Sequence, residues 1–247
     1  MILLVDIGNT RLKWAVSDGT QLSSQQAIVR SNIDHTQLAS MMLNGIEPSR
    51  IVVSNVAGAQ AGQEFARAIG LLSTTPIEYV QSTRSACGVT NAYPQPERLG
   101  TDRWMSVIAA HYLVGAACIA TFGTAMTIDA VAADGRHLGG VIVPGPQLMV
   151  DSLLTNTSNI AAHSIGGQIA EDLFADNTLG AIHQGAIHAC AALVEKAYAS
   201  CEQRLGSRPA LLLSGGASDQ VGAALKIPFQ SISDLVLRGL ALVSARG

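Results

Sequence analysis

The 247-residue chain has little charge, few aromatic side chains and no run of basic residues. Charged residues make up 13% of the sequence and aromatic residues 4%, and the formal net charge is −3. Without a Lys/Arg cluster, nothing indicates binding to nucleic acid or to an anionic membrane surface. Apolar residues make up 48% of the chain, and Gly is abundant. This composition is typical of a well-buried α/β protein.

Signals for export or membrane insertion are also missing. The opening MILLVDIGNT has no basic segment before its apolar run and reaches Asp6 early, so we expect no signal peptide. Apolar stretches are interrupted by Gly, His, Asp or Pro before they reach the length of a membrane span. Four cysteines are present without metal-binding or redox spacing: Cys87, Cys118, Cys190 and Cys201. We therefore expect a soluble cytoplasmic protein with reduced thiols.

The chain is predicted to consist of two similar halves. An apolar run at residues 2–6, a Gly-Asn-Thr turn and an alternating segment at 11–16 predict an opening β-hairpin. A similar pattern returns at residues 118–131. When 121–131 is aligned with 6–16 without a gap, the glycines and the final Ala-Val pairs coincide. We interpret this as a duplicated α/β fold, with lobes of residues 1–115 and 116–247 around a central cleft.

The Gly-Asn-Thr turn that follows Asp6 is the strongest functional motif. Gly8 lets the backbone approach a ligand closely, while Asn9 and Thr10 offer polar side chains and backbone N–H groups to phosphate oxygens. A carboxylate at the end of the strand can hold hydrated Mg²⁺ against those phosphates. An ordinary hairpin turn is the competing interpretation, because Gly-Asn is common in such turns. The echo at Gly123 favours two hairpins that grip a polyphosphate.

A second candidate is the acid–base pair at the start of a predicted helix. Thr101 is the predicted N-cap, and Asp102 and Arg103 follow in the first turn of a helix that runs toward residue 114. The competing explanation for Asp102 is a favourable interaction with the helix dipole. The adjacent Arg103 and the nearby Tyr93 favour a functional role.

A third candidate is the glycine pair Gly215 and Gly216 after a predicted strand at residues 210–213. A flat base can lie against such a backbone, although a plain strand-to-helix turn explains two glycines equally well. The chain contains neither G-x-x-x-x-G-K-[ST] nor G-x-G-x-x-G. P-loop and Rossmann nucleotide sites are therefore disfavoured.

Taken together, these motifs resemble those of the type III pantothenate kinases, in the superfamily of acetate kinase, sugar kinases, Hsp70 and actin. The resemblance covers nearly the whole chain. The motifs, in order, are Asp-x-Gly-Asn-Thr, Asn-x-Tyr, Gly-x-Asp-Arg-Trp, Phe-Gly-Thr-Ala-x-Thr, Leu-Gly-Gly-x-Ile-x-Pro-Gly, Asn-Thr and Ser-Gly-Gly. The resemblance implies an actin-like (ribonuclease H-like) fold, a homodimer, and phosphorylation of pantothenate by ATP as the first step toward coenzyme A.

The resemblance also implies roles for individual residues. Asp6 would hold Mg²⁺ through water, and Asp102 would be the general base for the hydroxyl of pantothenate. The residues implied to contact ATP are Gly8, Asn9, Thr10, Lys13, Gly123, Thr124, Gly215 and Gly216. The residues implied to line the pantothenate pocket are Tyr93, Gly100, Thr101, Arg103 and Thr178.

One position departs from the family pattern. Many members have Asp where this chain has Thr121, and that position is associated with a monovalent cation, usually K⁺. A neutral hydroxyl is a weaker cation ligand than a carboxylate. The implied cofactors are therefore ATP and Mg²⁺, with K⁺ or NH₄⁺ required only weakly or through other oxygens.

Two alternatives stay open. The chain could phosphorylate another small hydroxyl compound on the same fold, although Tyr93 and residues 100–103 favour pantothenate. It could also be a nucleotide-binding regulator without turnover. Asp6 and Asp102 argue against that alternative, because a pure binding protein has no need of a base.

Overall fold

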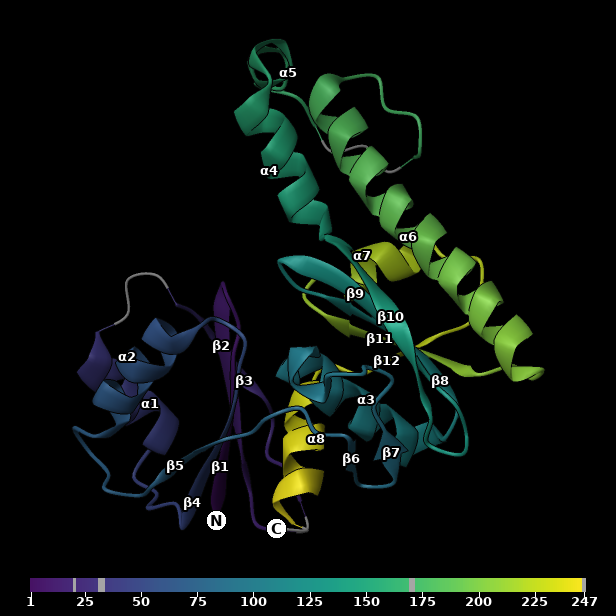
Figure 1. Ribbon diagram of the computed structural model, residues 1–247. Helices are drawn as coiled ribbons and strands as arrows, with labels where there is room; N and C mark the ends of the chain where they lie inside the picture. The colour runs from purple at the N-terminus through teal and green to yellow at the C-terminus, as the bar shows by residue number, and fades with distance from the viewer. Residues whose placement is uncertain (20, 31–33, 169–171, 246–247) are drawn as a thin grey trace. The chain divides into compact units, whose positions relative to one another are not determined.

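Tertiary contacts divide the chain into two compact units (Figure 1). The computed structural model describes residues 1–19, 21–30, 34–168 and 172–245. Unit 1 comprises Met1–Gly115, Ala133–Leu138 and Asp234–Gly247, and unit 2 comprises Ala116–Ala132 and Gly139–Ser233. The bounds of these units differ from the predicted lobes of residues 1–115 and 116–247, because Ala133–Leu138 and Asp234–Gly247 belong to unit 1. The division into two lobes around a cleft stays a prediction.

Unit 1 is built on a five-stranded mixed sheet in the order β3-β2-β1-β4-β5. Its strands are β1 (Ile2–Ile7), β2 (Arg11–Ser17), β3 (Gln26–Val29), β4 (Arg50–Asn55) and β5 (Ile77–Tyr79). The central strand β1 pairs antiparallel with β2 and parallel with β4. The predicted opening hairpin is thus confirmed. Side chains alternate along β1, so Ile7 lies on one face of the sheet and Asp6 on the other.

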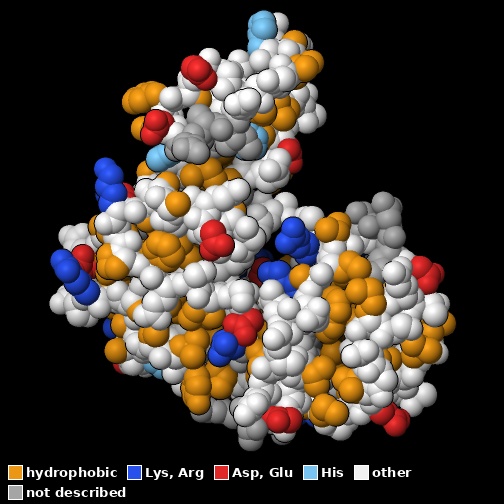
Figure 2. Space-filling view, turned by 180° about the vertical axis from the view of Figure 1, so that it is seen from behind, with side chains coloured by type: hydrophobic (Ala, Val, Ile, Leu, Met, Phe, Trp, Pro, Cys, Tyr) orange, Lys and Arg blue, Asp and Glu red, His pale blue; other side chains and the backbone are white. Residues whose placement is uncertain are grey.

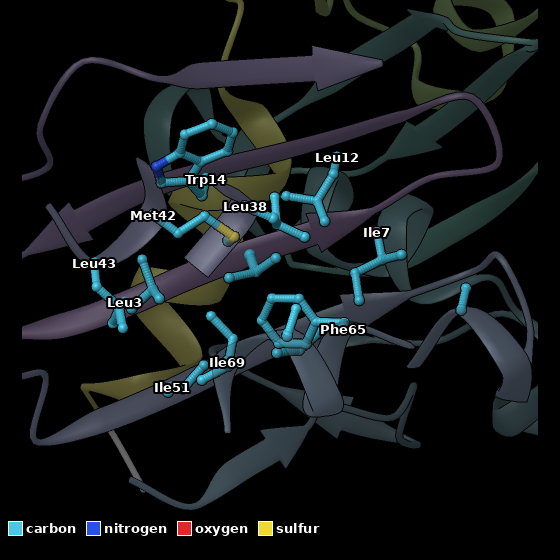
Figure 3. Packing of buried hydrophobic residues seen from close by; sticks show 14 residues of the cluster. Leu3, Ile7, Leu12, Trp14, Leu38, Met42, Leu43, Ile51, Phe65 and Ile69 are labelled. Carbon is cyan, nitrogen blue, oxygen red and sulfur yellow. The ribbon is translucent and has the colours of Figure 1, made fainter. Parts of the chain in front are cut away.

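Helices α1 (His35–Leu43) and α2 (Ala59–Ile69) pack over the face that carries Ile7. The side chains of Met42 and Phe65 lie over the strands in the close view of this core (Figure 3). Each such large apolar side chain contributes about 1.5–3 kcal/mol when fully buried. Asp34 caps α1 by accepting a hydrogen bond from the N–H of Gln37 at 3.0 Å. Ile7 and Leu12 of the first hairpin are part of this core.

The opposite face of the sheet, which carries Asp6, is covered by α8 (Leu235–Ser244), and α3 (Thr101–Val114) packs against α8 and β4. The two helices approach closely, because a Cβ at Gly239 would collide with the backbone of Met105. Smaller elements of unit 1 are β6 (Ser85–Ala86), β7 (Val89–Thr90) and the short 3₁₀ helix η1 (Pro96–Arg98). The predicted helix from residue 101 toward residue 114 is confirmed.

Unit 2 contains a second five-stranded sheet, in the order β10-β9-β8-β11-β12. Its strands are β8 (Ala117–Phe122), β9 (Ala125–Val131), β10 (His137–Pro144, which begins in unit 1), β11 (Ala210–Gly215) and β12 (Gln230–Ser231). Strand β8 pairs antiparallel with β9 and parallel with β11, as β1 does with β2 and β4. The matching order and directions confirm the predicted duplication.

The ungapped alignment of the two hairpins is wrong by one residue beyond the turn. In the first hairpin Ile7 pairs with Leu12, whereas in the second Phe122 pairs with Met126. The second turn is therefore one residue shorter. The coincidence of the two Ala-Val pairs is accidental, because Ala15 lies opposite Leu4 and corresponds in register to Asp129, which lies opposite Ile119.

The helices of unit 2 are α4 (Pro146–Asn156), α5 (Ser158–His163), α6 (Thr178–Leu205) and α7 (Ser218–Ala223). Helix α6 packs on β8 and β9, and it shares a small apolar cluster of Val150, Ile182 and Ala186 with α4. Within the described ranges, none of the helices combines the length and the apolar character that crossing a membrane requires.

Candidate functional site

Asp6 lies in a row of three polar side chains near the ends of neighbouring strands. Its strand partners are Lys13 on β2 and Ser54 on β4, and directly paired residues point to the same face of a sheet. Asp6 is 7% exposed and Ser54 is fully buried. Asp6 Oδ1 and Ser54 Oγ are buried without a hydrogen-bond partner among the described residues.

The charge state of Asp6 is set by opposing influences. Burial raises the pKa of Asp6 from its ordinary value of 3.8 to about 7, Lys13 lowers it, the charge of Asp102 raises it, and Ser54 lowers it. Ser54 is thus near enough to favour the charged form of Asp6, although the Ser54 hydroxyl makes no well-formed hydrogen bond to Asp6 Oδ1. A buried carboxylate oxygen without a partner is costly unless a cation or a proton completes its environment. The residues present therefore fit a hydrated divalent cation.

Asp102 lies in the first turn of α3, as predicted, but Thr101 is not the N-cap. The N-cap is Gly100, which makes no side-chain cap bond, and Thr101 is the first helical residue. Asp102 Oδ1 accepts a hydrogen bond from the N–H of Arg103 at 2.8 Å. A Cβ at Gly100 would lie 2.7 Å from Asp102 Oδ1. Glycine at the cap therefore leaves room for the carboxylate, whose charge reaches Asp6.

Arg103 and Tyr93 form a second contact in unit 1. The buried guanidinium of Arg103 donates from Nη1 to Tyr93 Oη at 3.1 Å and lies 5.8 Å from the centre of the tyrosine ring. The loop that carries Tyr93 is held by Asn91, whose Oδ1 accepts from the N–H of Tyr93 at 2.9 Å. Arg84 donates to the carbonyls of Tyr93 and Pro94. The Tyr93–Arg103 pair is therefore arranged before any ligand binds.

His137 was not singled out by the sequence. Its ring stacks on Tyr93, with centroids 6.4 Å apart and planes inclined by 10°. His137 is 4% exposed, and its Nδ1 accepts a hydrogen bond from the N–H of Ala92 at 3.4 Å. The two bonded residues are 45 positions apart in the chain. No local pattern marks this histidine, so only the tertiary structure links it to Tyr93.

The remaining candidates of unit 1 lie in the first hairpin turn. The N–H of Gly8 donates to the carbonyl of Arg11 at 3.0 Å and closes the turn, which contains Asn9 and Thr10. Lys13 follows on β2 beside Asp6. Unit 1 thus contains the proposed Mg²⁺ carboxylate, the turn proposed to bind phosphate, the proposed base and the Tyr93–Arg103 pair.

Unit 2 carries the second group of candidates. Thr121, the residue before the last of β8, lies between its partners Thr127 on β9 and Ser214 on β11. Three hydroxyls therefore occupy the row that in unit 1 holds Lys13, Asp6 and Ser54. In the second turn the N–H of Gly123 donates to the carbonyl of Ala125 at 3.0 Å, and Thr124 lies between them.

The Gly-Gly turn and Thr178 also belong to unit 2. Gly215 has φ +104, and a Cβ there would collide with the backbone of Phe122, so the fold itself requires glycine. The N–H of Gly216 donates to the carbonyl of Phe122 at 3.0 Å. Thr178 is the first residue of α6, after the N-cap Asn177.

Comparison with solved structures defines the class of fold. A Baf-family protein from Campylobacter jejuni superposes with a TM-score of 0.60 at 20% identity, covering 99% of this chain and 98% of that one. The activator of the 2-hydroxyisocaproyl-CoA dehydratase from Clostridium difficile, with bound ADPNP, gives 0.54 at 11% identity, covering 99% and 93%. With the duplicated mixed sheets, these likenesses show the fold of the actin-like ATPases.

Sequence comparison then gives the family. The profile of a family described as type III pantothenate kinase matches residues 2–200. A type III pantothenate kinase of Nitrosospira multiformis is 35% identical over 245 residues, covering 99% of this chain and 91% of the relative. One of Aromatoleum aromaticum is 36% identical over 248 residues, covering 99% and 98%. The chain belongs to the type III pantothenate kinase family.

Proposed function

We propose that this chain transfers the γ-phosphoryl group of ATP to the primary hydroxyl of pantothenate, giving 4′-phosphopantothenate. The observation that carries the proposal is the match with type III pantothenate kinases along 99% of the chain. The proximity of two carboxylates, Asp6 and Asp102, in unit 1 supports it. Phosphoryl transfer needs these parts: a charged group that holds the metal and a group that accepts the proton of the attacking hydroxyl.

Asp6 is the proposed Mg²⁺ carboxylate. Its unpartnered buried Oδ1 supports this role, because carboxylate oxygens bind Mg²⁺ well and the ion usually keeps several waters. Mg²⁺, when bound, neutralises charge on the phosphates. Lys13 beside Asp6 supplies a second positive charge for them. The other proposed ATP contacts are Gly8, Asn9 and Thr10 in unit 1 and Gly123, Thr124, Gly215 and Gly216 in unit 2.

Asp102 is the proposed general base. Its position at the start of α3, next to Arg103 and the Tyr93 pair, supports a role at the pantothenate hydroxyl. In phosphoryl transfer the enzyme mainly positions the hydroxyl in line with the γ-phosphate. A base within hydrogen-bond reach adds on the order of 10²–10⁴-fold. Gly100, Thr101, Tyr93 and Arg103 complete the proposed pantothenate pocket of unit 1. Thr178 stays a proposed pantothenate contact.

The monovalent-cation site is proposed to be weak. Thr121, Thr127 and Ser214 present a row of hydroxyls where a carboxylate is common in the family. Hydroxyl oxygens without a negative charge bind K⁺ or NH₄⁺ less strongly than a carboxylate does.

A homodimer is proposed from the apolar surface of unit 2. Figure 2 shows hydrophobic side chains on the outside of the part that α4, α5 and the start of α6 form. Ile165 and Phe174 are 85% and 91% exposed, and Ile142, Leu148 and Leu153 are also exposed. Exposed apolar patches of this kind mark interaction surfaces.

The test is a coupled ADP-release assay with ATP, Mg²⁺ and pantothenate on the parent protein and on Asp102→Asn. We expect pantothenate-dependent turnover that falls at least about 10²-fold in the variant. Asp34→Asn is the matched control, because it also removes a charge from a helix start of unit 1, and it is expected to keep turnover.

Three other outcomes would change the assignment. ATP binding without turnover under any cation would favour a nucleotide-binding regulator. Turnover only with a different hydroxyl compound would replace pantothenate as substrate. Turnover that Asp102→Asn leaves unchanged would support the kinase activity and would assign the general base to another residue.

A further inference from the structure

Arg30, the residue that follows β3, binds three successive carbonyls of the first phosphate turn. Its backbone N–H donates to the carbonyl of Thr10 at 2.9 Å. Its Nη1 donates to the carbonyls of Gly8 and Asn9, each at 3.1 Å. Nη2 lies 3.9 Å from Glu64 on α2. The guanidinium thus ties the turn to the body of unit 1.

These contacts fix the direction in which the turn presents its amides. In a trans peptide the C=O of one residue and the N–H of the next point in opposite directions. The carbonyls of Gly8 and Asn9 point to Arg30. The N–H groups of Asn9 and Thr10 must therefore point away from the guanidinium. Successive N–H groups oriented together form a concave site for anions.

The second hairpin has a glycine at the position that corresponds to Arg30. Thr124 immediately precedes β9 as Thr10 precedes β2, and Gly145 immediately follows β10 as Arg30 follows β3. The N–H of Gly145 donates to the carbonyl of Thr124 at 2.9 Å, which is the same backbone bond that Arg30 makes to Thr10.

The two turns differ in length and in the residue at this position. A Cβ at Gly145 would collide with the carbonyls of Gly123 and Thr124, so the shorter second turn packs directly on a glycine. The first turn has one additional residue, Asn9, and therefore one additional carbonyl to satisfy. The guanidinium of Arg30 binds that carbonyl. The side chain of Arg30 thus satisfies the additional carbonyl that the longer turn contains.

We infer that Arg30 is a positioning residue for ATP: it holds the Gly8–Asn9–Thr10 turn in the conformation that turns its amides toward the phosphates. This inference rests on the proposed function, because it assumes that the first turn binds ATP. Arg30 acts through the turn and not on the reacting atoms. Its removal should weaken nucleotide binding and leave pantothenate binding unaffected.

Arg50 provides a matched control in the same unit. It donates to both carboxylate oxygens of Glu78, at 2.9 and 2.8 Å, and to the carbonyl of Ser244 at 2.8 Å. The side chains of Arg30 and Arg50 are 25% and 34% exposed. Arg50 lies opposite Ile2, at the other end of β1 from Asp6. Arg50→Gln therefore removes comparable bonds away from the phosphate turn.

The experiment measures binding of Mg²⁺–ATP by calorimetry without pantothenate, and the KM for pantothenate at saturating ATP. In Arg30→Gln we expect the Kd for ATP to rise about 10- to 100-fold, as expected for losing hydrogen bonds from a charged donor. The KM for pantothenate should stay within about twofold. Arg30→Lys should lie between the parent and Arg30→Gln, because one ammonium group can reach part of the carbonyl set. Arg50→Gln should bind ATP as the parent does.

Two results would overturn the inference. In one, Arg30→Gln binds ATP like the parent protein. In the other, ATP and pantothenate are affected equally while melting temperature falls, as a general structural role predicts. Failure of the parent protein to bind ATP would instead contradict the proposed function, and calorimetry on the parent separates that case from the other two.

Discussion

Replacing Asp6 with Asn removes a buried group whose proton uptake changes when the protein folds. Burial raises the pKa of Asp6 from 3.8 to about 7. Because the pKa is higher in the folded state, the folded protein holds this proton more tightly than the unfolded chain. The resulting stabilisation is complete below pH 3.8 and is lost as the pH rises through 7.

The size of the effect follows from the difference between the two values. Each unit by which the pKa of Asp6 is shifted corresponds to 1.36 kcal/mol, so the full contribution to the free energy of unfolding is about 4 kcal/mol. About 3 kcal/mol of it remains at pH 5 and almost none at pH 8. Asn has the same shape and cannot ionise. The free energy of unfolding of the parent, minus that of Asp6→Asn, should therefore fall by about 3 kcal/mol between pH 5 and pH 8.

Urea denaturation at pH 5, 6, 7 and 8, without Mg²⁺ or ATP, measures this difference. Both tryptophans of the chain, Trp14 on β2 and Trp104 on α3, lie in unit 1 and are buried. Their fluorescence therefore reports the unfolding of the unit that contains Asp6. Comparing parent and variant at each pH cancels the titration of all other groups that the substitution leaves unchanged.

A difference in unfolding free energy that stays constant from pH 5 to pH 8 would refute this reasoning. It would mean that Asp6 is charged in the folded protein at pH 5, with its Oδ1 satisfied by a partner.

Asp6→Asn should also lose Mg²⁺-dependent ATP binding, and retained binding would contradict the proposed metal role of the carboxylate.

Three further predictions concern the pocket, the cation and the assembly. Tyr93→Phe removes the oxygen that Arg103 contacts at 3.1 Å, so the KM for pantothenate should rise about tenfold in steady-state kinetics while the Kd for ATP stays unchanged. His137→Phe keeps a ring against Tyr93 and should raise this KM less. A larger rise in His137→Phe than in Tyr93→Phe would contradict the hydrogen bond as the main contribution. Because Thr121 is neutral, K⁺ should stimulate turnover only weakly or only at high concentration. Activity near zero without K⁺ that K⁺ restores with ordinary affinity would disprove this. Light scattering should give twice the mass of a single chain, and Phe174→Glu should shift the protein toward monomer because it places a charge on the apolar surface; a monomeric parent protein would rule out the dimer.

Local patterns in the sequence were sufficient for the elements near the site. The apolar run that ends at Asp6, the Gly-Asn-Thr turn and the alternating segment predicted the first hairpin, which the structure confirms. The helix that begins at Thr101 was predicted within one residue, although its N-cap is Gly100. Such patterns succeed because strand and turn preferences depend on nearest neighbours in the chain.

The duplication was predicted correctly, but its residue-by-residue match was not. Two turns of different length place Ala15 and Ala130 at different positions in their sheets. Strand β3, which positions Arg30, was not predicted, because its four residues are short and mostly exposed. Short strands gain their stability from the neighbouring strand and not from their own sequence.

The sequence by itself determined the family, the fold class, and the motifs that contain Asp6 and Asp102, because these depend on residue order and local spacing. Only the tertiary structure decided that Asp6 is buried between Lys13 and Ser54 within reach of the charge of Asp102. It also decided that His137 stacks on Tyr93 and that Arg30 binds the carbonyls of Gly8 and Asn9. Burial, charge coupling and hydrogen bonds between residues distant in sequence arise only when strands pair and helices pack, and no local pattern encodes them.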